Sequence, residues 1–273
     1  MRVETAGIVG LGLIGASIGL RLKRGIVSRV VGMDVDQKAV ELASQRGAVD
    51  EAGTSHGLLR TADVVFVAVP PQVTVQAALQ AARAMRTGSV LTDVASTKAG
   101  IIRELEERLP PGVRYVGGHP MAGSERRGAG AADAALLDGR AYIVTPTPRT
   151  DREAVSVITG LARQMGMRPV VLSPEDHDEL VAQVSHLPYL VAAALVAAAS
   201  DEAAQLSGPT FSGFARVAKS PVDLWTRICI ENRTAIRRAL ERFRAELDRI
   251  EQALDDETEL TRALEKSQQR VTQ

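Results

Sequence analysis

The chain has 273 residues, and its 33 Lys and Arg side chains balance its 33 Asp and Glu side chains. A hydrophobic content of 45% beside 24% charged residues supports a sizeable core, which excludes wholesale disorder. Because the net charge is zero and no dense run of Lys or Arg occurs, the composition argues against binding to nucleic acid. We expect one or two globular domains.

Cysteine content and hydropathy indicate where such a chain works. Cys229 is the only cysteine, which excludes an intramolecular disulfide, and four scattered histidines without a cysteine cluster argue against a metal site. The start of the chain has no export signal, so we expect a cytoplasmic protein. The longest apolar run, residues 187–199, is shorter than the ~18 residues of a membrane-spanning helix and is interrupted by Pro188. It predicts a buried helix and no membrane contact.

The first part of the chain alternates β-branched strands with helices at the spacing of βαβ units. Strands are predicted at residues 6–9, 30–33, 64–69, 90–92, 114–116, 142–145 and 170–172. Helices are predicted between them at residues 14–23, 37–46, 73–85, 101–108 and 152–165. Because strands such as 64–69 are apolar on both faces, helices must cover both faces of the sheet. We therefore expect an α/β domain with a Rossmann-type, doubly wound sheet over residues 1–172.

Residues 173–273 are predicted to form an all-α domain. Ser173 and Pro174 open its first helix, and no strand pattern follows. Near the end an apolar seam recurs at steps of three and four residues, formed by Leu240, Phe243, Leu247, Ile250 and Leu254. A helical segment of this size cannot bury such a seam alone, so we expect a homodimer through this domain. The alternative is that the seam packs on the chain's own Rossmann-type domain.

The first chemical motif is Gly10-x-Gly12-x-x-Gly15, which directly follows the first predicted strand and opens the first predicted helix. In that context the glycines make a tight turn and let a pyrophosphate approach the backbone. The N–H groups at the helix start, those of Leu13 and Ile14, would bind it. The motif predicts a dinucleotide site, against the alternative of a glycine turn that binds nothing.

Asp34 ends the second strand, where a carboxylate accepts hydrogen bonds from the adenosine ribose. Its charge would repel a 2′-phosphate, so we expect NAD rather than NADP, although Lys38 and Arg46 lie close enough in sequence to offset it. Val69 and Pro70 end another strand of the sheet, where the backbone commonly lines the cofactor crevice.

Two polar clusters, residues 93–98 and 117–125, follow later strands and should reach the same edge of the sheet. His119 lies between a predicted strand and a glycine-rich loop. Because the pKa of histidine is near neutrality, this position suits acid or base catalysis on a hydroxyl that loses hydride. His119 is therefore the candidate catalytic base, against the alternative of a structural histidine.

Ser185 and His186 lie within an apolar helix, where polar side chains need partners. Pro188 removes a backbone hydrogen bond, so we expect the helix to bend beside His186. A ligand site would explain the pair, and so would a hydrogen-bonded core histidine. His177 is nine residues earlier, half a turn out of phase on an unbroken helix. We interpret it as a first-turn or domain-contact residue that cannot face the same pocket.

Arg216 lies in a predicted loop between apolar helices. Its planar guanidinium suits a bidentate grip on a carboxylate, and a surface or interhelical salt bridge is equally consistent with the sequence.

Together these motifs resemble one family, the prephenate and arogenate dehydrogenases of tyrosine biosynthesis, nearly from end to end. The residues that carry the resemblance are the glycine fingerprint 7–15, Asp93-x-x-Ser96-x-Lys98, the Gly-His-Pro-Met-Ala-Gly-Ser-Glu segment 118–125, His177-Asp178, Ser185-His186-Leu187-Pro188, Arg216-Val217-Ala218, Ser220-Pro221 and Trp225. The glycine fingerprint is shared by many families. The segment 118–125 and the Ser-His-Leu-Pro motif are much narrower.

The resemblance implies an oxidative decarboxylation with NAD, in which C4 of a cyclohexadienol gives hydride to nicotinamide while the C1 carboxylate leaves as carbon dioxide. It implies that His119 accepts the hydroxyl proton, assisted by Ser96. His186 and Arg216 would then bind the small-molecule substrate, with Arg216 on a carboxylate.

The resemblance further implies that Ser124 contacts the substrate and that Glu125 belongs to the substrate site. We expect Glu125 to pair with Arg216 when the site is empty and so to act as a gate.

Two departures from the family pattern leave the substrate open. Tyr189 stands where many relatives have a second histidine, and residues 208–211 replace a glycine run. We expect prephenate, converted to 4-hydroxyphenylpyruvate, by analogy. Alternatives are arogenate, converted to tyrosine, or another NAD(P)-linked hydroxy-acid dehydrogenase or imine reductase. A non-catalytic NAD sensor would not need His119, Ser96 and Arg216.

Overall fold

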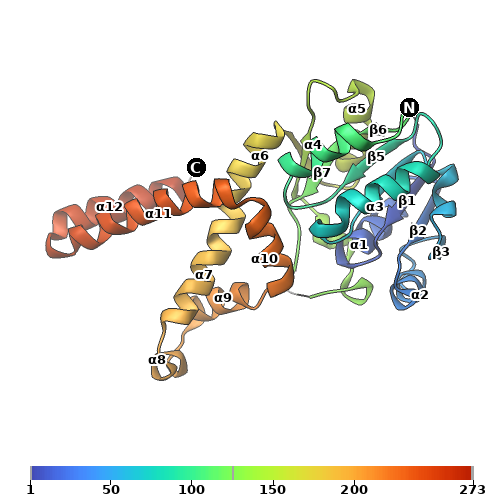
Figure 1. The fold of residues 1–273 in the computed structure, drawn as a ribbon. Helices are drawn as coiled ribbons and strands as arrows, with labels where there is room; N and C mark the ends of the chain where they lie inside the picture. The colour runs from blue at the N-terminus through green and yellow to red at the C-terminus, as the bar shows by residue number, and fades with distance from the viewer. Residues whose placement is uncertain (1, 125, 272–273) are drawn as a thin grey trace.

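The computed structural model describes residues 2–124 and 126–271. It has an α/β part and a helical part, and the last two helices extend as an arm away from the α/β part (Figure 1). The chain passes from the one part to the other between residues 171 and 174. The predicted division at residues 172 and 173 falls in this connection.

Six parallel strands form the main sheet in the order β3-β2-β1-β4-β5-β6. They are β1 Thr5–Val9, β2 Arg29–Met33, β3 Glu51–Gly53, β4 Val64–Val67, β5 Val90–Asp93 and β6 Arg114–Tyr115. The chain builds outward from β1 to β3, then returns to the other side of β1 and continues from β4 to β6. This order confirms the predicted doubly wound, Rossmann-type sheet. It places a switch point between β1 and β4, and doubly wound folds commonly bind ligands at such a point, at the carboxyl edge of the sheet.

The main sheet is apolar on both faces. In β4, Val64 and Phe66 belong to one buried cluster. Val65 and Val67 belong to the other. The helices that pack on the first cluster are α1 Leu13–Leu22, α2 Gln37–Gln45 and α5 Arg152–Gln164, and those on the second are α3 Pro71–Ala84 and α4 Ala99–Arg108. The alternation of side chains along β4 thus fills two core layers at once.

A second sheet of three strands has the order β7-β8-β9. Its strands are β7 Gly117–Pro120, β8 Ala141–Thr145 and β9 Arg168–Val171, with β7 antiparallel and β9 parallel to β8. The predicted strands 142–145 and 170–172 therefore belong to this sheet and not to the main one. Strand β7 was missed because its two glycines indicate a loop.

The glycines of β7 serve close packing. A Cβ on Gly118 would lie 2.5 Å from the Tyr142 hydroxyl and 2.8 Å from the Asp93 carbonyl oxygen, so no larger residue fits there. Because Asp93 ends β5, this contact places β7 at the carboxyl end of β5. The next residue of β7 is His119.

The regular elements after β9 in the described part of the chain are helical, as predicted. They are α6 Pro174–Val181, α7 Leu187–Ala198, α8 Asp201–Gln205, α9 Pro209–Ala218, α10 Val222–Glu231, α11 Arg233–Gln252 and α12 Glu257–Val271, with short 3-10 turns elsewhere in the chain. Ala182 packs against Ala235, Ile236 and Ala239 in a small core. This core joins α11 to the turn between α6 and α7.

That turn is a π-helical segment, Ala182–His186, which makes α6 and α7 one continuous helix of 25 residues, Pro174–Ala198. Pro188 cannot donate a backbone hydrogen bond, so the turn before it widens. The predicted bend beside His186 therefore falls at a π-helical turn. By length and composition alone, with a mean hydropathy of 1.7, the helix could cross a membrane. The helix expected at residues 187–199 is present as α7, but its expected burial is wrong in the single chain, because the described residues that α7 buries are Tyr189 and Ala192.

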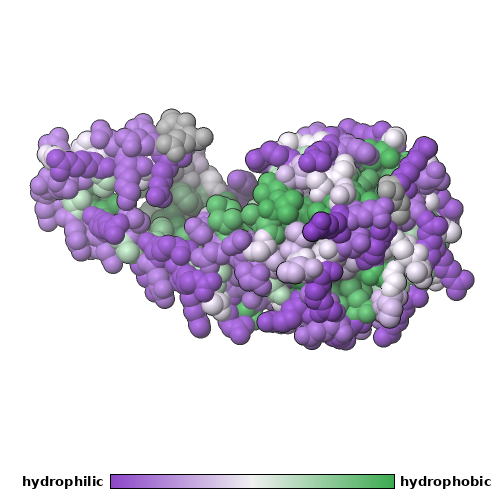
Figure 2. All heavy atoms as spheres, turned by 90° about the horizontal axis from the view of Figure 1, so that it is seen from above, coloured by the Kyte–Doolittle hydropathy of each residue, from purple (hydrophilic) through white to green (hydrophobic). Residues whose placement is uncertain are grey.

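The apolar seam of α11 is only partly covered. Leu240 packs beside the small core, whereas Leu247 is 51% and Leu254 is 64% exposed. Helices α11 and α12 lie side by side in the arm, away from the α/β part (Figure 1). The alternative that the seam packs on the chain's own Rossmann-type domain is therefore wrong. Figure 2 shows two lobes from above, with a largely hydrophilic surface and hydrophobic side chains on the larger lobe and towards the junction.

Candidate active site

The glycine loop joins β1 to α1 at the carboxyl edge of the main sheet. Gly10 has a φ of 93°, and a Cβ there would lie 2.4 Å from a backbone carbonyl oxygen that follows β4. Gly12 is the N-cap of α1; no side chain caps this helix, and a Cβ on Gly12 would meet open space. The first-turn N–H groups, including those of Leu13 and Ile14, are therefore available to an anion. Gly15 lies inside α1 and packs directly against the carbonyl oxygen of Gly10.

Asp34 directly follows β2 and fastens the glycine loop to it. Its carboxylate accepts hydrogen bonds from the backbone N–H groups of Leu11, at 2.7 Å, and Asp36, at 2.9 Å. A negative charge thus stands beside the loop. The guanidinium of Arg46 donates to the carbonyl oxygen of Ala132 at 2.5 Å, so it already has a partner in the fold.

Val69 and Pro70 follow β4 on the other side of the switch point. A Cβ on Gly10 would lie 2.8 Å from a methyl group of Val69, so this side chain lies against the glycine loop. Pro70 is the N-cap of α3. Both predicted positions therefore lie at the switch point between β1 and β4.

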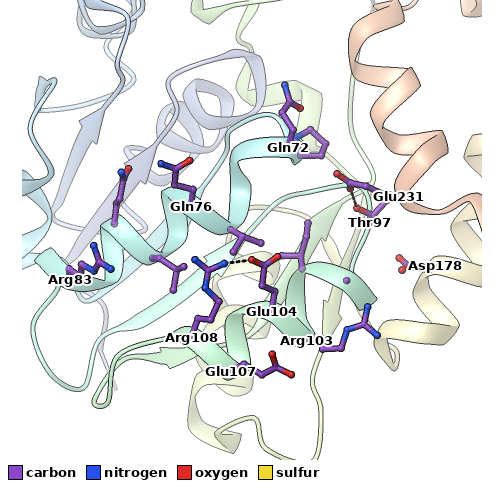
Figure 3. A pocket seen from close by; sticks show the side chains of 16 residues that line it. Gln72, Gln76, Arg83, Thr97, Arg103, Glu104, Glu107, Arg108, Asp178 and Glu231 are labelled. Carbon is purple, nitrogen blue, oxygen red and sulfur yellow. Dashed lines mark hydrogen bonds and ion pairs between the residues drawn. The ribbon is translucent and has the colours of Figure 1, made fainter.

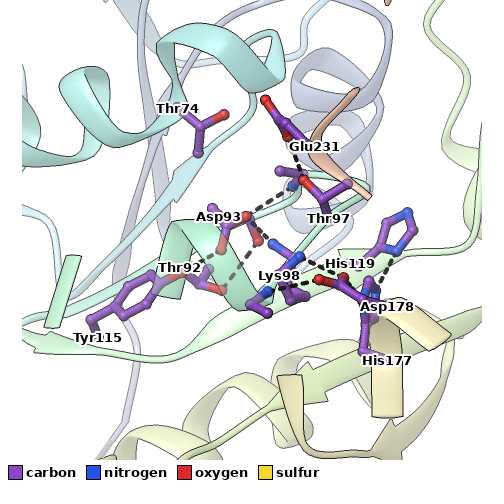
Figure 4. Close-up of polar contacts among 12 residues, drawn as sticks. Thr74, Thr92, Asp93, Thr97, Lys98, Tyr115, His119, His177, Asp178 and Glu231 are labelled. Carbon is purple, nitrogen blue, oxygen red and sulfur yellow. Dashed lines mark hydrogen bonds and ion pairs between the residues drawn. The ribbon is translucent and has the colours of Figure 1, made fainter. Parts of the chain in front are cut away.

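His119 lies on β7, which corrects the expectation of a loop histidine, and its side chain is buried. Its Nδ1 atom is 2.8 Å from Nε2 of His177 on α6. Nδ1 of His177 is in turn 2.8 Å from Oδ1 of Asp178. Figure 4 shows the three side chains as a connected row. Nε2 of His119 has no hydrogen-bond partner among the described residues and remains for a ligand.

His177 is therefore a contact between the two parts of the chain, as predicted, but its exclusion from the pocket is wrong. It touches His119 directly, and its electrostatic interaction with His186 lowers the pKa of His186. The π-helical turn between His177 and His186 breaks the regular phase on which the exclusion rested.

Asp178 is held by the start of α4. Its carboxylate accepts hydrogen bonds from the backbone N–H groups of Lys98, at 2.8 Å, and Ala99, at 3.0 Å. Burial alone would raise the pKa of Asp178, but the hydrogen bonds from His177 and these backbone groups outweigh it and lower the pKa. Asp178 is thus a carboxylate at neutral pH.

A buried ion pair between Lys98 and Asp93 lies beside the histidines (Figure 4). The hydroxyl of Tyr115 donates to Oδ1 of Asp93 at 2.8 Å, and the backbone N–H of Ala95 donates to Oδ2 at 3.0 Å. Burial and the charge of Asp93 hold the pKa of Tyr115 well above its usual range. These bonds compensate part of the cost of burying both charges.

The three histidines have lowered pKa values for one main reason. Burial places the pKa of His119 well below 6.5, and electrostatic interactions with His177, Lys98 and His186 lower it further. Burial also lowers the pKa of His186 to about 4. For His177, burial outweighs the hydrogen bond with Asp178 and lowers the pKa. All three are therefore neutral at neutral pH, and each ring has one bare nitrogen.

His186 ends the π-helical turn, and Asn232 sets its orientation. The Asn232 amide nitrogen donates to the carbonyl oxygen of Asp178 at 2.7 Å and lies 3.2 Å from Nδ1 of His186. An amide nitrogen only donates, so Nδ1 is bare and Nε2 carries the proton. Nε2 is buried without a hydrogen-bond partner among the described residues. The ring of Trp225 packs edge to face on that of His186, with 6.1 Å between the ring centroids. It also stacks on the ring of Tyr189, with 4.0 Å between the centroids.

Among residues 2–124 and 126–271, the structure gives no hydrogen bond between the site histidines and the other predicted site residues. Ser96 is half-buried in the loop between β5 and α4, and the hydroxyl of Ser124 accepts a hydrogen bond from the backbone N–H of Arg126 at 3.1 Å. Arg216 lies in the last turn of α9, which corrects the expected loop; it is exposed and has no ion-pair partner in the described part of the chain. Glu125, and with it the predicted gate, lies outside the described residues.

A groove of about 900 Å³ runs between α3 and α4 on the outside of the α/β part (Figure 3). Gln72, Gln76 and Arg108 line it, and the hydrogen bond between Thr97 and Glu231, 2.6 Å long, lies at one end. Residues 10–15 are not among its lining residues. It is therefore distinct from the glycine loop.

Sequence reasoning missed the partners of the two site histidines. The adjacency of His177 and Asp178 was the available signal for the first, and Pro188 indicated the irregular turn between His177 and His186. Asn232 had no such signal, because only packing of α11 against the π-helical turn places it beside His186.

Family models and curated relatives that match this chain all point to one family. Two family models match the chain: prephenate dehydrogenase, nucleotide-binding domain, over residues 18–185, and prephenate dehydrogenase, dimerization domain, over residues 173–266. The prephenate dehydrogenase of Bacillus subtilis is 30% identical over 263 residues, which are 93% of this chain and 71% of the relative.

Solved structures agree. Prephenate dehydrogenase from A. aeolicus, in complex with hydroxyphenyl propionate and NAD+, has a TM-score of 0.91 and 29% identity, covering 100% of this chain and 98% of that one. Arogenate dehydrogenase from Synechocystis has a TM-score of 0.84 and 31% identity, covering 98% and 99%.

These matches bear on several expectations. The nucleotide-binding family model and the NAD+ in the A. aeolicus structure bear out NAD as the expected cofactor. The fold, a Rossmann-type part followed by a helical part, is confirmed as well. One family model covers more than half of the chain and a second covers most of the remainder. The chain therefore belongs to the prephenate dehydrogenase family of oxidoreductases.

Proposed function

We propose that the chain catalyses the NAD-dependent oxidative decarboxylation of prephenate to 4-hydroxyphenylpyruvate. The observation that carries this proposal is the position of His119. It is a buried, neutral histidine at the carboxyl end of β5, on the edge of the sheet where the glycine loop also lies, and its Nε2 is left for a ligand. A neutral imidazole nitrogen there can accept the proton of an alcohol that is being oxidised.

The residues around the glycine loop fit NAD. The uncapped start of α1 at Gly12 offers N–H groups to a pyrophosphate, and Val69 and Pro70 follow β4 on the other side of the switch point. The carboxylate of Asp34 suits ribose hydroxyls and would repel a 2′-phosphate, and Arg46 is held by another partner. NAD, when bound there, supplies the hydride acceptor.

His119 is the proposed base. Its Nε2 accepts the hydrogen bond of the C4 hydroxyl and takes the proton as C4 loses its hydride and becomes trigonal. When the C1 carboxylate leaves as carbon dioxide, its bonding electron pair enters the ring, which becomes aromatic. The phenolic oxygen then takes the proton back from His119, so no net proton is released. We propose that Ser96 assists from the adjacent loop.

Substrate binding is proposed for the helical part and the loop after β7. The buried N–H of His186 lacks a protein acceptor among the described residues, and a substrate oxygen would satisfy it. Arg216 has an unpaired guanidinium in the described chain, which suits a substrate carboxylate. Ser124 is the proposed contact from the loop.

Prephenate is the preferred substrate because the side chains that pack on Trp225, His186 and Tyr189, are neutral. His186 and Tyr189 are uncharged at neutral pH, and burial raises the pKa of the Tyr189 hydroxyl, so both offer neutral donors. Such donors suit the keto and carboxylate oxygens of a pyruvyl side chain. Arogenate, with an ammonium group in its place, is the second candidate and is favoured by the similarity to the Synechocystis enzyme.

The test is to mix the purified protein with NAD and either prephenate or arogenate and to follow the absorbance of the reduced cofactor. We expect NADH and 4-hydroxyphenylpyruvate from prephenate, with weaker turnover when NADP replaces NAD. Tyrosine from arogenate alone would move the specificity to the second candidate. If folded protein that binds NAD turns over neither compound, the proposed reaction is wrong.

We further propose that the protein is a homodimer, joined through its helical part. The family model over residues 173–266 describes a dimerization domain, and the seam of α11 leaves Leu247 and Leu254 more than half exposed. A second copy of this chain would cover that surface. The single cysteine keeps the reducing cytoplasm as the expected compartment.

A further inference from the structure

We propose that His177 and Asp178 form a hydrogen-bonded relay with His119 that holds the His119 proton on Nδ1 and leaves Nε2 free as the proton acceptor. His177 and Asp178 are positioning residues in this scheme, because they act through His119 and not on the substrate. The proposal rests on the proposed role of His119 as base, and it adds two residues of α6 that support this base.

The direction of each hydrogen bond in the row of His119, His177 and Asp178 follows from the protonation state of Asp178. Asp178 accepts backbone N–H bonds on both oxygens, so it is a carboxylate and can only accept from His177. The proton of His177 therefore lies on Nδ1, and its Nε2 is bare. A bare Nε2 only accepts, so at 2.8 Å Nδ1 of His119 must donate to it.

The same row stabilises the charge that forms during turnover. When Nε2 of His119 takes the substrate proton, the ring becomes an imidazolium, and its Nδ1–H bond to His177 strengthens. The proton on Nδ1 can shift to Nε2 of His177, which places the positive charge next to the carboxylate of Asp178. Return of the proton to the product oxygen reverses both movements and restores the starting tautomers.

Burial makes this arrangement necessary. His119 is 7% exposed and His177 is fully buried, so few groups other than protein side chains contact either ring. The ammonium group of Lys98 is already paired with Asp93, and both are fully buried. The carboxylate of Asp178, itself fixed by the N-terminus of α4, is the group that faces His177 directly.

The first test reads the tautomers without any substrate. The chain has four histidines, so an imidazole ¹⁵N spectrum of the labelled protein at neutral pH contains four rings, assigned by single His→Gln variants. We expect the proton on Nδ1 for His119 and His177. We expect it on Nε2 for His186, which serves as the internal control because Asn232 enforces the opposite tautomer. A spectrum that shows His119 protonated on Nε2 would overturn the relay.

The second test separates a relay from simple packing. His177→Leu should lower kcat about 10²-fold with unchanged NAD affinity, because no acceptor then fixes the His119 proton. His177→Gln should recover most of kcat, because its amide oxygen can accept from Nδ1 of His119. In a His119→Asn background, His177→Leu should have no further effect. His56→Gln, a half-buried histidine of the α/β part, is the control for loss of an imidazole.

Equal losses in the Leu and Gln variants, or a loss that persists in the His119→Asn background, would show that His177 only packs, and the relay would be rejected. If His177→Leu does not fold, His177→Gln and the tautomer spectrum still decide. Because the spectrum needs no turnover, absence of activity with prephenate and arogenate would reject the proposed function and leave the relay to stand or fall on its own.

Discussion

The two parts of the chain bury their apolar side chains to different degrees. The α/β part encloses two large clusters, one on each face of the main sheet. The helical part has a small cluster around Ala235 and Ile236, while Leu206, Val222 and Leu254 are 87%, 71% and 64% exposed. Exposed apolar surface on this scale marks an interaction face. One chain thus buries the apolar side chains of the α/β part but leaves many of those in the helical part exposed, where the proposed second copy would cover them.

The largest effect should come from a charge on that face. Leu247→Glu on α11 should weaken dimerisation at least about 10³-fold, because each of two symmetry-related leucines loses about 2 kcal/mol of burial and a charge is desolvated. Light scattering or sedimentation would measure it. The matched control is Val171→Glu in the α/β part, because Val171 is 54% exposed where Leu247 is 51% exposed.

A Leu247→Glu protein that stays dimeric, or a Val171→Glu protein that dissociates to the same extent, would break the contrast between the two parts. NAD binding is the companion measurement. It should be unchanged in both variants, because the glycine loop lies in the part whose apolar side chains a single chain buries.

The next effect tests which part carries the chemistry. His119→Asn should lower kcat by about 10²-fold or more with little change in NAD affinity, because it removes the proposed base and retains a small polar side chain. Steady-state kinetics and a separate NADH titration would measure the two quantities. His56→Asn is the control histidine of the same part. Near-normal turnover in the His119→Asn protein would move the chemistry elsewhere.

The smallest effect concerns stability against pH. The pKa of His186 is about 4 in the fold against 6.5 ordinarily, so the unfolded chain binds more protons between these values. The contribution of His186 to the free energy of unfolding is therefore lost as pH falls from 6.5 towards 4, by at most about 1.4 kcal/mol per pH unit. Melting curves should show a shallower decline in His186→Gln than in the unchanged protein. Parallel curves for the two proteins would contradict a buried, neutral His186.

Local sequence patterns predicted the elements whose structure is determined by residues that are close together in the sequence. The glycine loop follows from the tight turn after β1, and the two-faced core follows from apolar runs such as β4. Strand β7 could not be predicted from local pattern. A glycine is required at position 118 because the Tyr142 hydroxyl and the Asp93 carbonyl oxygen pack against it, and both residues are distant in sequence.

The site divides in the same way. His119 and the cofactor loop were found because their motifs are local, whereas the approach of His177 to His119 depends on α6 docking on the sheet edge. The regular helical phase gave the wrong answer for His177 and His186, since the π-helical turn changes it. Arg216 was assigned to a loop, because the helical pattern of α9 is short and begins at Gly208-Pro209.

The carboxylate of Asp178 caps the start of α4, so the α/β part depends on a residue of the helical part. Helix α4 has no capping side chain of its own, and its first N–H groups are satisfied by a residue about 80 positions later. A fragment that ended at residue 172 would keep both core clusters of the α/β part but would lose this cap, with a cost of about 1 kcal/mol. The dinucleotide-binding unit is therefore not a freely exchangeable module, and a chimera that kept it would need to bring α6 along.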